Sequence, residues 1–244
     1  MIIKSDKKIK FQYCEPFIIE RTNEEKCDIQ KNWNEYIQSR NSEDCFDGDI
    51  FLVKDFYSDK ESFLIKVGKG KYSELIYAKQ TGKLKVNSLF VASYIITSDN
   101  YLGFVMDKGG RVNTIGGMAD ASDFINGVFE PEVCLAREFE EELGVNLFDI
   151  NLFSSIAAKY IKIADEEEQK LSLNPIGILY EIRTGFTMEE LQTVLENCKE
   201  KVVENNIKPI FYAPNDHLRL EEYKNKVSYV LELFNCIIES KEFK

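Results

Sequence analysis

The sequence predicts a layered α/β or α+β sandwich, and three observations lead to that fold class. Runs of β-forming residues alternate along the chain with segments that repeat apolar residues every three or four positions. The chain has 244 residues, of which 44% are hydrophobic, so it can bury a core of domain size. No internal repeat or low-complexity segment interrupts this order, and the five prolines are dispersed.

Residues 1–86 are expected to form a small N-terminal α+β region. Apolar residues at helical spacing, including Ile29 and Trp33, predict a helix over residues 24–40, and this spacing makes Trp33 a core residue rather than a base-stacking one. Three further elements are predicted: strands at 50–56 and 62–67 and a short helix at 72–78. The polar stretch 80–85 marks the predicted boundary.

Residues 87–244 are expected to form the larger region. Two β-rich runs, 89–97 and 101–106, are joined by a Ser-Asp-Asn turn, and glycine pairs follow at 109–110 and 116–117. The later predicted elements are strands at 152–163, 173–183 and 207–212, a helix at 188–202 and a closing helix at 220–238.

The helix over residues 131–143 has the clearest boundaries, because Pro131 suits a first helical position and Gly144 suits the residue after the end. At about 100° of rotation per residue, its apolar and acidic side chains fall on separate arcs. One arc holds Leu135, Ala136, Phe139 and Leu143, and the other holds Glu138, Glu141 and Glu142. One face is therefore expected in the core.

The acidic face breaks two rules of helix stability. Glu138 lies three and four positions before Glu141 and Glu142, so like charges are neighbours. The same carboxylates crowd the C-terminal turns, where the backbone dipole favours cations. Two interpretations remain open: a solvated surface, or a site for a hard divalent cation that prefers oxygen ligands. Arg137 could orient Glu141 or form a simple surface ion pair.

Composition excludes some partners. A net charge of −11 argues against duplex nucleic acid but allows a small phosphorylated ligand beside a bound metal.

The six scattered cysteines lack zinc-site spacing and are expected as reduced thiols. The N-terminus lacks the apolar stretch of a secretory signal, and no apolar run approaches the ~20 residues of a membrane span, so we expect a cytoplasmic protein without a membrane partner.

Residues 137–145 read R-E-F-E-E-E-L-G-V, which resembles the second half of the Nudix box, R-E-U-x-E-E-x-G-U, where U is a bulky apolar residue. Gly116 and Gly117 resemble the glycine pair that opens this box, and the similarity covers roughly residues 87–244. The resemblance implies an α+β fold of the α/β/α sandwich type and a pyrophosphohydrolase that uses Mg²⁺, with Mn²⁺ as the alternative ion.

The site residues that the resemblance implies are Glu138, Glu141 and Glu142 as metal ligands, with the main-chain carbonyl of Gly117 as a further ligand. Glu138 and Glu141 also count as catalytic, since one glutamate could act as the general base, and Arg137 would hold the glutamates in place. Water would attack a diphosphate linkage and release a nucleoside monophosphate and a phosphorylated remainder, X. Asp165, Glu166, Glu167 and Glu168 are alternative sources of the base, although a solvated turn is favoured there. His217 is expected to be an exposed residue near a helix cap rather than a catalyst.

The loop before the helix departs from the family pattern. Nineteen residues, 118–136, separate Gly117 from Arg137, whereas the pattern has five residues, a glutamate and seven more, which is thirteen. The position eight before Arg137 is Phe129 instead of the usual glutamate, and the adjacent Glu130 is the candidate replacement.

Upstream segments narrow the resemblance. Four segments are similar to the animal Nudix UDP-glucose and UDP-galactose diphosphatase type: W-N-E-Y-I from Trp33, C-F-D-G-D-I-F-L-V over 45–53, residues 63–78, and V-N-T-I-G-G over 112–117. A UDP-sugar is therefore the expected small-molecule nucleotide substrate, with ADP-ribose or a dinucleotide as alternatives. A non-catalytic ligand-sensing module and a purely structural protein are the alternatives from other classes. The N-terminal region has two open roles, as part of the substrate pocket or as the contact of a homodimer.

Overall fold

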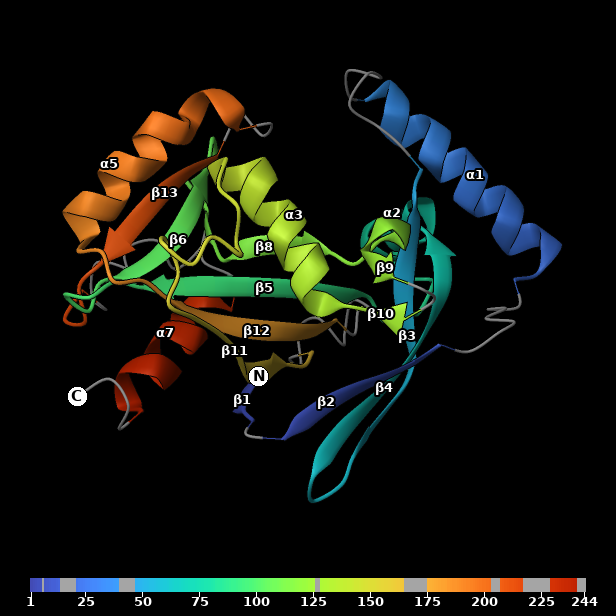
Figure 1. Ribbon diagram of the computed structural model, residues 1–244. Helices are drawn as coiled ribbons and strands as arrows, with labels where there is room; N and C mark the ends of the chain where they lie inside the picture. Colours follow the sequence, from blue (N-terminus) through green and yellow to red (C-terminus); the bar gives the residue numbers. More distant parts are fainter. Residues whose placement is uncertain are drawn as a thin grey trace.

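The computed structural model describes residues 1–5, 7–13, 21–39, 47–125, 128–164, 175–202, 207–216 and 229–240. A large mixed sheet lies between two helical layers, and a smaller sheet with two helices stands beside it (Figure 1). The predicted α+β class, in the form of an α/β/α sandwich, is therefore confirmed.

The large sheet has the strand order β1-β11-β12-β5-β6-β13, with β7 paired to β6 and β8 paired to β5. Only the β12–β5 pair is parallel among these described strands. The strands are β1 (Ile2–Lys4), β5 (Leu89–Ile96), β6 (Leu102–Asp107), β7 (Val112–Asn113), β8 (Ile115–Met118), β11 (Ser155–Lys162), β12 (Ile176–Arg183) and β13 (Ile207–Tyr212).

The central strand β5 is buried on both faces. Leu89, Val91 and Ile95 face the core beneath α3 (Pro131–Leu143) and α5 (Met188–Cys198). Tyr94 and its even-numbered neighbours face the second core, under α7 (Val230–Glu239). This alternation is the period of two that a strand imposes on its side chains, and it explains why the run reads as continuously apolar.

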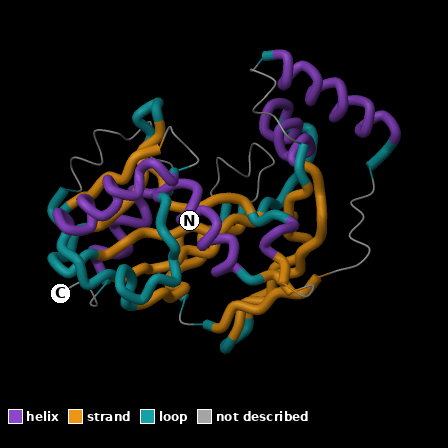
Figure 2. Tube along the Cα trace, turned by 45° about the horizontal axis from the view of Figure 1, so that its top comes forward, coloured by secondary structure: helices purple, strands orange, loops and turns teal. Residues whose placement is uncertain are grey.

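The smaller sheet has the order β2-β4-β3 and carries both helices of the N-terminal region. These elements are β2 (Lys8–Tyr13), α1 (Asn23–Gln38), β3 (Asp49–Ser58), β4 (Ser62–Lys71) and α2 (Tyr72–Thr81). Helix α1 starts with a capping box in which Thr22 accepts from the backbone of Glu25 and the Glu25 side chain accepts from the backbone of Thr22. The two helices stand together at the outer end of the molecule (Figures 1 and 2).

Backbone hydrogen bonds join the two regions. Phe51 of β3 donates to the carbonyl of Ala119 at 2.9 Å, and Val53 donates to the carbonyl of Asn87 at 2.6 Å. Strand β1, from the very start of the chain, pairs with β11 in the large sheet. The division of the chain between residues 86 and 87 stays a prediction.

Some elements differ from the predictions. The strand expected at 152–163 begins only at Ser155, because the backbone N–H groups of Leu152 and Phe153 close a turn onto the carbonyl of Asp149. The predicted helix 188–202 ends at Cys198, and a 3₁₀ turn, η3 (Lys199–Lys201), follows. Of the closing helix, only Val230–Glu239 falls within the described residues.

Four cysteines lie in the described segments, and all four are free thiols: Cys27, Cys134, Cys198 and Cys236. This agrees with the expectation of reduced cysteines, while Cys14 and Cys45 lie outside the described residues. No helix in the part of the chain that the structure describes combines the length and the apolar content that a membrane crossing requires.

Candidate functional site

Helix α3 carries the predicted carboxylates and is fixed by its own sequence. It begins at Pro131 and ends before Gly144, which has a left-handed φ of 70°. Leu135 and Phe139 are completely buried in the core between α3 and the large sheet. Because the apolar face is anchored there, the opposite arc of the helix is turned toward strand β8.

Strand β8 contains the glycine pair, and at each of the two positions a Cβ atom would clash with a neighbouring group. Gly116 has a φ of +146°, and a Cβ there would overlap the carbonyl oxygen of Val91. A Cβ on Gly117 would overlap the carboxylate of Glu138. The backbone N–H of Gly116 also donates to Glu142 Oε2 at 3.1 Å. The two glycines therefore let the α3 carboxylates lie directly against the main chain of β8.

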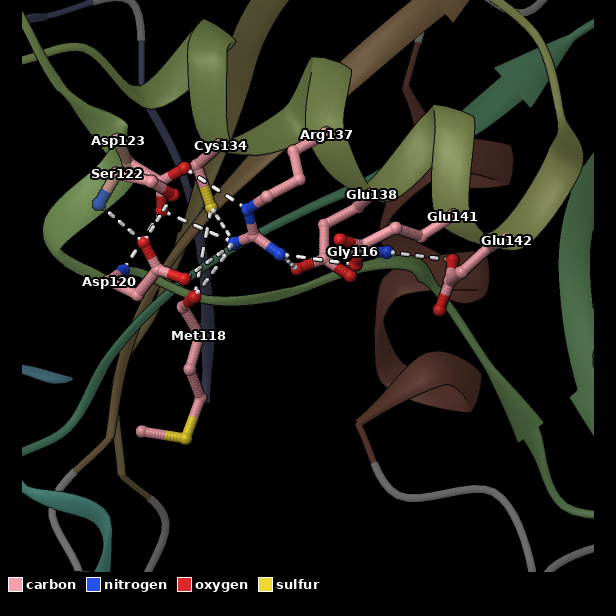
Figure 3. A network of polar contacts seen from close by, with 10 residues as sticks. All are labelled: Gly116, Met118, Asp120, Ser122, Asp123, Cys134, Arg137, Glu138, Glu141 and Glu142. Carbon is pink, nitrogen blue, oxygen red and sulfur yellow. Dashed lines mark hydrogen bonds and ion pairs between the residues drawn. The ribbon is translucent and has the colours of Figure 1, made fainter. Parts of the chain in front are cut away.

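Arg137 holds two of the three glutamates. Its Nη1 donates to Glu138 Oε1 at 2.7 Å and to Glu141 Oε2 at 3.2 Å (Figure 3). Its Nη2 donates to the main-chain carbonyl of Met118 at 3.2 Å. Glu138 and Glu142 are almost completely buried, whereas the Glu141 side chain is about one-third exposed. The guanidinium thus ties the acidic face of α3 to the end of β8.

On its other side, Arg137 is held by the carboxylate of Asp123. Nε donates to Oδ1 at 3.3 Å and Nη2 to Oδ2 at 3.2 Å, while Asp120 Oδ2 lies 4.0 Å from Nη2. Asp123 ends a short 3₁₀ turn, η2 (Ala121–Asp123), in which Asp120 accepts from the backbone of Ser122 and Asp123 accepts from the backbone of Asp120. This reciprocal capping fixes the Asp123 carboxylate where the guanidinium reaches it.

The electrostatics of this cluster keep Arg137 charged and Cys134 neutral. Burial alone lowers the pKa of Arg137, but its hydrogen bonds to Asp123 and the charge of Glu138 outweigh that effect and raise the pKa above its usual value. Burial raises the pKa of the Cys134 thiol, whose sulfur lies 3.7 Å from Nη2. Cys134 is therefore a packed thiol behind the arginine and not a thiolate ligand.

A cleft of about 970 Å³ opens beside this cluster. Its lining combines the α3 and β8 residues with residues of the N-terminal region. Five carboxylates line it, from Asp49, Asp120, Glu138, Glu141 and Glu142, and Arg137 is the only cationic residue among the described lining residues. Such a cleft repels a phosphate group unless a cation changes the sign of the local field.

The structure brings five of the predicted site residues together in this cleft, namely Arg137, Glu138, Glu141, Glu142 and Gly117. Within the described segments, however, no three acidic, histidine or cysteine side chains stand in an arrangement that could hold one ion. Glu138 and Glu141 share Arg137, while Glu142 accepts from Gly116. A single ion bound by all three requires side-chain rotation, and the ligand roles stay predictions.

Glu130, the candidate replacement for the family glutamate, does not lie in this cluster. Glu130 is the N-cap residue of α3 and lines a different cavity beside Lys7, and no hydrogen bond or ion pair joins it to Arg137 among the described contacts. Asp123 makes that contact instead. Counting six positions forward from Gly117, as the pattern G-x5-E requires, leads to Asp123, whereas counting back from Arg137 leads to Phe129.

The extra residues of the loop consequently lie between Asp123 and Arg137. Thirteen residues, 124–136, stand where the pattern has seven, and they include a hairpin of β9 (Phe124–Ile125) and β10 (Val128–Phe129). The ring of Phe124 stacks on Phe51 of β3 with centroids 3.7 Å apart. The insertion therefore packs against the N-terminal region and leaves the contact between Asp123 and Arg137 intact.

Other candidates are either structural or outside the described residues. Trp33 is confirmed as a core residue, since it is 5% exposed and stacks on Tyr36 with centroids 5.5 Å apart. His217 and the acidic loop 165–168 lie outside the described residues.

Comparisons with known proteins give the following similarities. No protein-family model matches the chain, and no curated protein matches it. A solved structure of a Deinococcus radiodurans protein is 16% identical, with a TM-score of 0.44, over 77% of this chain and 97% of its own. A Nudix-family hydrolase from Clostridium perfringens is 13% identical, with a TM-score of 0.35, over 62% of this chain and 96% of its own. An ADP-ribose pyrophosphatase from Streptococcus suis is 15% identical, with a TM-score of 0.32, over 53% of this chain and 75% of its own.

Proposed function

We propose that this chain is a Nudix-type pyrophosphohydrolase, which uses Mg²⁺ or Mn²⁺ to hydrolyse a nucleoside diphosphate linked to another group, X. One observation carries the proposal. The residues that the Nudix-box resemblance singles out, on α3 and on β8, line one cleft large enough for a nucleotide. A solvated acidic surface would not require a glycine beneath Glu138 or an arginine that holds two of its carboxylates.

The donor set fits a hard divalent cation. Carboxylate oxygens of Glu138, Glu141 and Glu142, with the main-chain oxygen of Gly117, are the ligand type that Mg²⁺ and Mn²⁺ prefer. When bound, such an ion neutralises phosphate charge and lowers the pKa of a coordinated water. The exposed part of Glu141 gives that side chain room to turn toward an ion.

The chain's own residues then orient the reacting groups. Arg137 fixes the carboxylates of Glu138 and Glu141, and Asp123 fixes Arg137. One of the α3 glutamates accepts a proton from the attacking water as the water oxygen bonds to phosphorus. The bond between phosphorus and the bridging oxygen breaks, and the products are a nucleoside monophosphate and phosphorylated X.

The finer proposal is that X is a sugar and the nucleoside is uridine. It is based on the short upstream similarities, and residues from these segments, Gly48, Asp49, Ile50 and Tyr72, line the cleft. ADP-ribose and dinucleotides remain the alternatives. A cytoplasmic location and a homodimer are further expectations that stay predictions.

A substrate panel tests the proposal. The purified protein with Mg²⁺ is incubated with UDP-glucose, ADP-ribose, NADH and dinucleoside polyphosphates, and release of nucleoside monophosphate is measured. We expect turnover of at least one compound. If none is hydrolysed under varied metal and pH, the proposed activity is wrong. If only UDP-glucose is inert, the UDP-sugar assignment alone is lost.

A further inference from the structure

Part of the cleft wall belongs to the N-terminal region. Ile50 of β3 and Tyr72 at the start of α2 line the cleft together with Met118, which follows the glycine pair. Among the described lining residues, Tyr72 is the only aromatic one. The cleft thus combines the α3 carboxylates, suited to a cation and phosphates, with the apolar and aromatic side chains of Ile50, Tyr72 and Met118. The Asp49 carboxylate beside Ile50 also lines the cleft and is paired with Lys71 at 2.7 Å.

Backbone hydrogen bonds and a ring contact fix the position of Tyr72. Its backbone N–H donates to the carbonyl of Gly48 at 3.1 Å, and the backbone N–H of the next residue, Ser73, donates to Asp47 Oδ1 at 2.8 Å. The rings of Tyr72 and Trp33 are nearly perpendicular, at 88°, with centroids 6.2 Å apart. A partly buried aromatic ring with this support loses little conformational entropy when a ligand binds.

The position of this wall relative to α3 is also fixed. Strand β3 donates from Phe51 to the carbonyl of Ala119, and Ile50 forms an isolated β-bridge with Asp120. Asp120 belongs to the turn that presents Asp123 to Arg137. The N-terminal region and the carboxylate cluster therefore share one backbone connection at the cleft.

We propose that Tyr72 stacks on the nucleobase of the substrate while the diphosphate faces α3. The inference rests on the proposed function for the identity of the ligand as a nucleotide. Ile50 and Met118 provide an apolar surrounding for a base, and the size of the cleft accommodates a base and a diphosphate together. Because every base has a π face, stacking on Tyr72 does not require one particular base.

The chain contains a reporter for this contact, since Trp33 is its only tryptophan and touches the Tyr72 ring. We expect titration with UMP or AMP to change the Trp33 fluorescence in a saturable way, and ribose 5-phosphate, which lacks a base, to leave it unchanged. The change should be lost in Tyr72→Ala and retained in Tyr72→Phe. Tyr57→Ala is the matched control, because Tyr57 is 51% exposed on the same small sheet and does not line the cleft.

Kinetics provide the second measurement. For a nucleotide that is hydrolysed, Tyr72→Ala should raise KM about tenfold with little change in kcat, because stacking contributes to binding before and during the reaction. Tyr72→Leu, which keeps apolar packing against Trp33, serves if the alanine variant does not fold, and it should show the same rise in KM.

The outcomes separate this inference from the proposed activity. If a nucleotide is hydrolysed but Tyr72→Ala or Tyr72→Leu keeps the wild-type KM and fluorescence change, the stacking role is wrong and the hydrolase proposal stands. If no compound is hydrolysed but UMP and AMP give a Tyr72-dependent change, base binding is supported and the hydrolase proposal falls. A change of equal size with ribose 5-phosphate overturns the stacking role, since the base would not be the group detected.

Discussion

Asp123 binds the guanidinium of Arg137 through both carboxylate oxygens, with Nε at 3.3 Å and Nη2 at 3.2 Å. The Asp123 side chain is completely buried, and Arg137 is one-quarter exposed. Arg137 in turn contacts Glu138 and Glu141, so a carboxylate outside α3 determines how the acidic face of α3 is arranged.

We expect Asp123→Asn to weaken both stability and hydrolysis. Breaking a buried ion pair by removing one partner costs ~3–5 kcal/mol, and the partial exposure of Arg137 reduces this to about 2 kcal/mol. Loss of a residue that positions ligands typically lowers activity ~10–100-fold. Urea unfolding and kcat measurements check both effects.

Glu130→Gln is the matched control for Asp123. Glu130 is the N-cap residue of α3, without a capping hydrogen bond from its side chain, and lies near Asp123 in the sequence, but it lines another cavity. We expect its kcat to equal that of the wild type. Equal losses in the two variants, or a wild-type kcat in Asp123→Asn, would show that Asp123 does not position Arg137 for the reaction.

Local signals in the sequence were sufficient for helix α3 and for the residues grouped around it. Pro131 and Gly144 mark its ends, and the apolar spacing of Leu135 and Phe139 turns the glutamates away from the core. The family resemblance added Gly117 of β8, and the structure brings these residues together in one cleft. Each of these signals lies within one short stretch of sequence.

The remaining features depend on contacts between distant segments. Counting back from Arg137 does not lead to Asp123, because the six extra residues of the loop lie between these two residues. The side of the cleft with Tyr72 comes from the pairing of Phe51 with Ala119, and no periodicity reveals such a pairing. Likewise, the N-terminus of Met1 donates to the carbonyl of Ile163, 162 positions away. Sequence patterns predict elements better than they predict which elements meet.

The α3 carboxylates can be tested one at a time against a neighbour on the same helix. Glu138→Gln, Glu141→Gln and Glu142→Gln should each lower kcat by about 100-fold or more, beyond the ~10–100-fold typical of residues that only support a ligand. Glu140→Gln should keep the wild-type kcat, because Glu140 is exposed and does not line the cleft. If steady-state assays give the same kcat for all four variants, the cluster is only a charged surface.

Metal binding has a readout that needs no substrate. At a Mg²⁺ concentration of about 100 times its Kd, binding to the folded state adds ~2.7 kcal/mol of stability. For a chain of this size the expected rise in Tm is about 5–10 °C, from ~2–4 °C for each kcal/mol. The rise should persist in Glu140→Gln and disappear when Glu138, Glu141 and Glu142 are all replaced by Gln. NaCl of equal ionic strength controls for screening, and an equal rise with NaCl would argue against a specific ion site.

A substitution at Gly117 tests whether the Glu138 carboxylate must lie against β8 for hydrolysis. In Gly117→Ala the new Cβ overlaps the Glu138 carboxylate, so the side chain has to move, at a cost of about 1–3 kcal/mol for overpacking. We expect kcat to fall about tenfold or more and the Mg²⁺-induced rise in Tm to shrink. Gly185→Ala is the control, because nothing lies within 4 Å of its Cβ position and its φ is not left-handed. Adding Glu138→Asp, which is one methylene shorter, should restore the stability of Gly117→Ala but not its kcat. If Gly117→Ala alone keeps both the wild-type kcat and the full response to Mg²⁺, the contact between Gly117 and Glu138 has no part in the reaction.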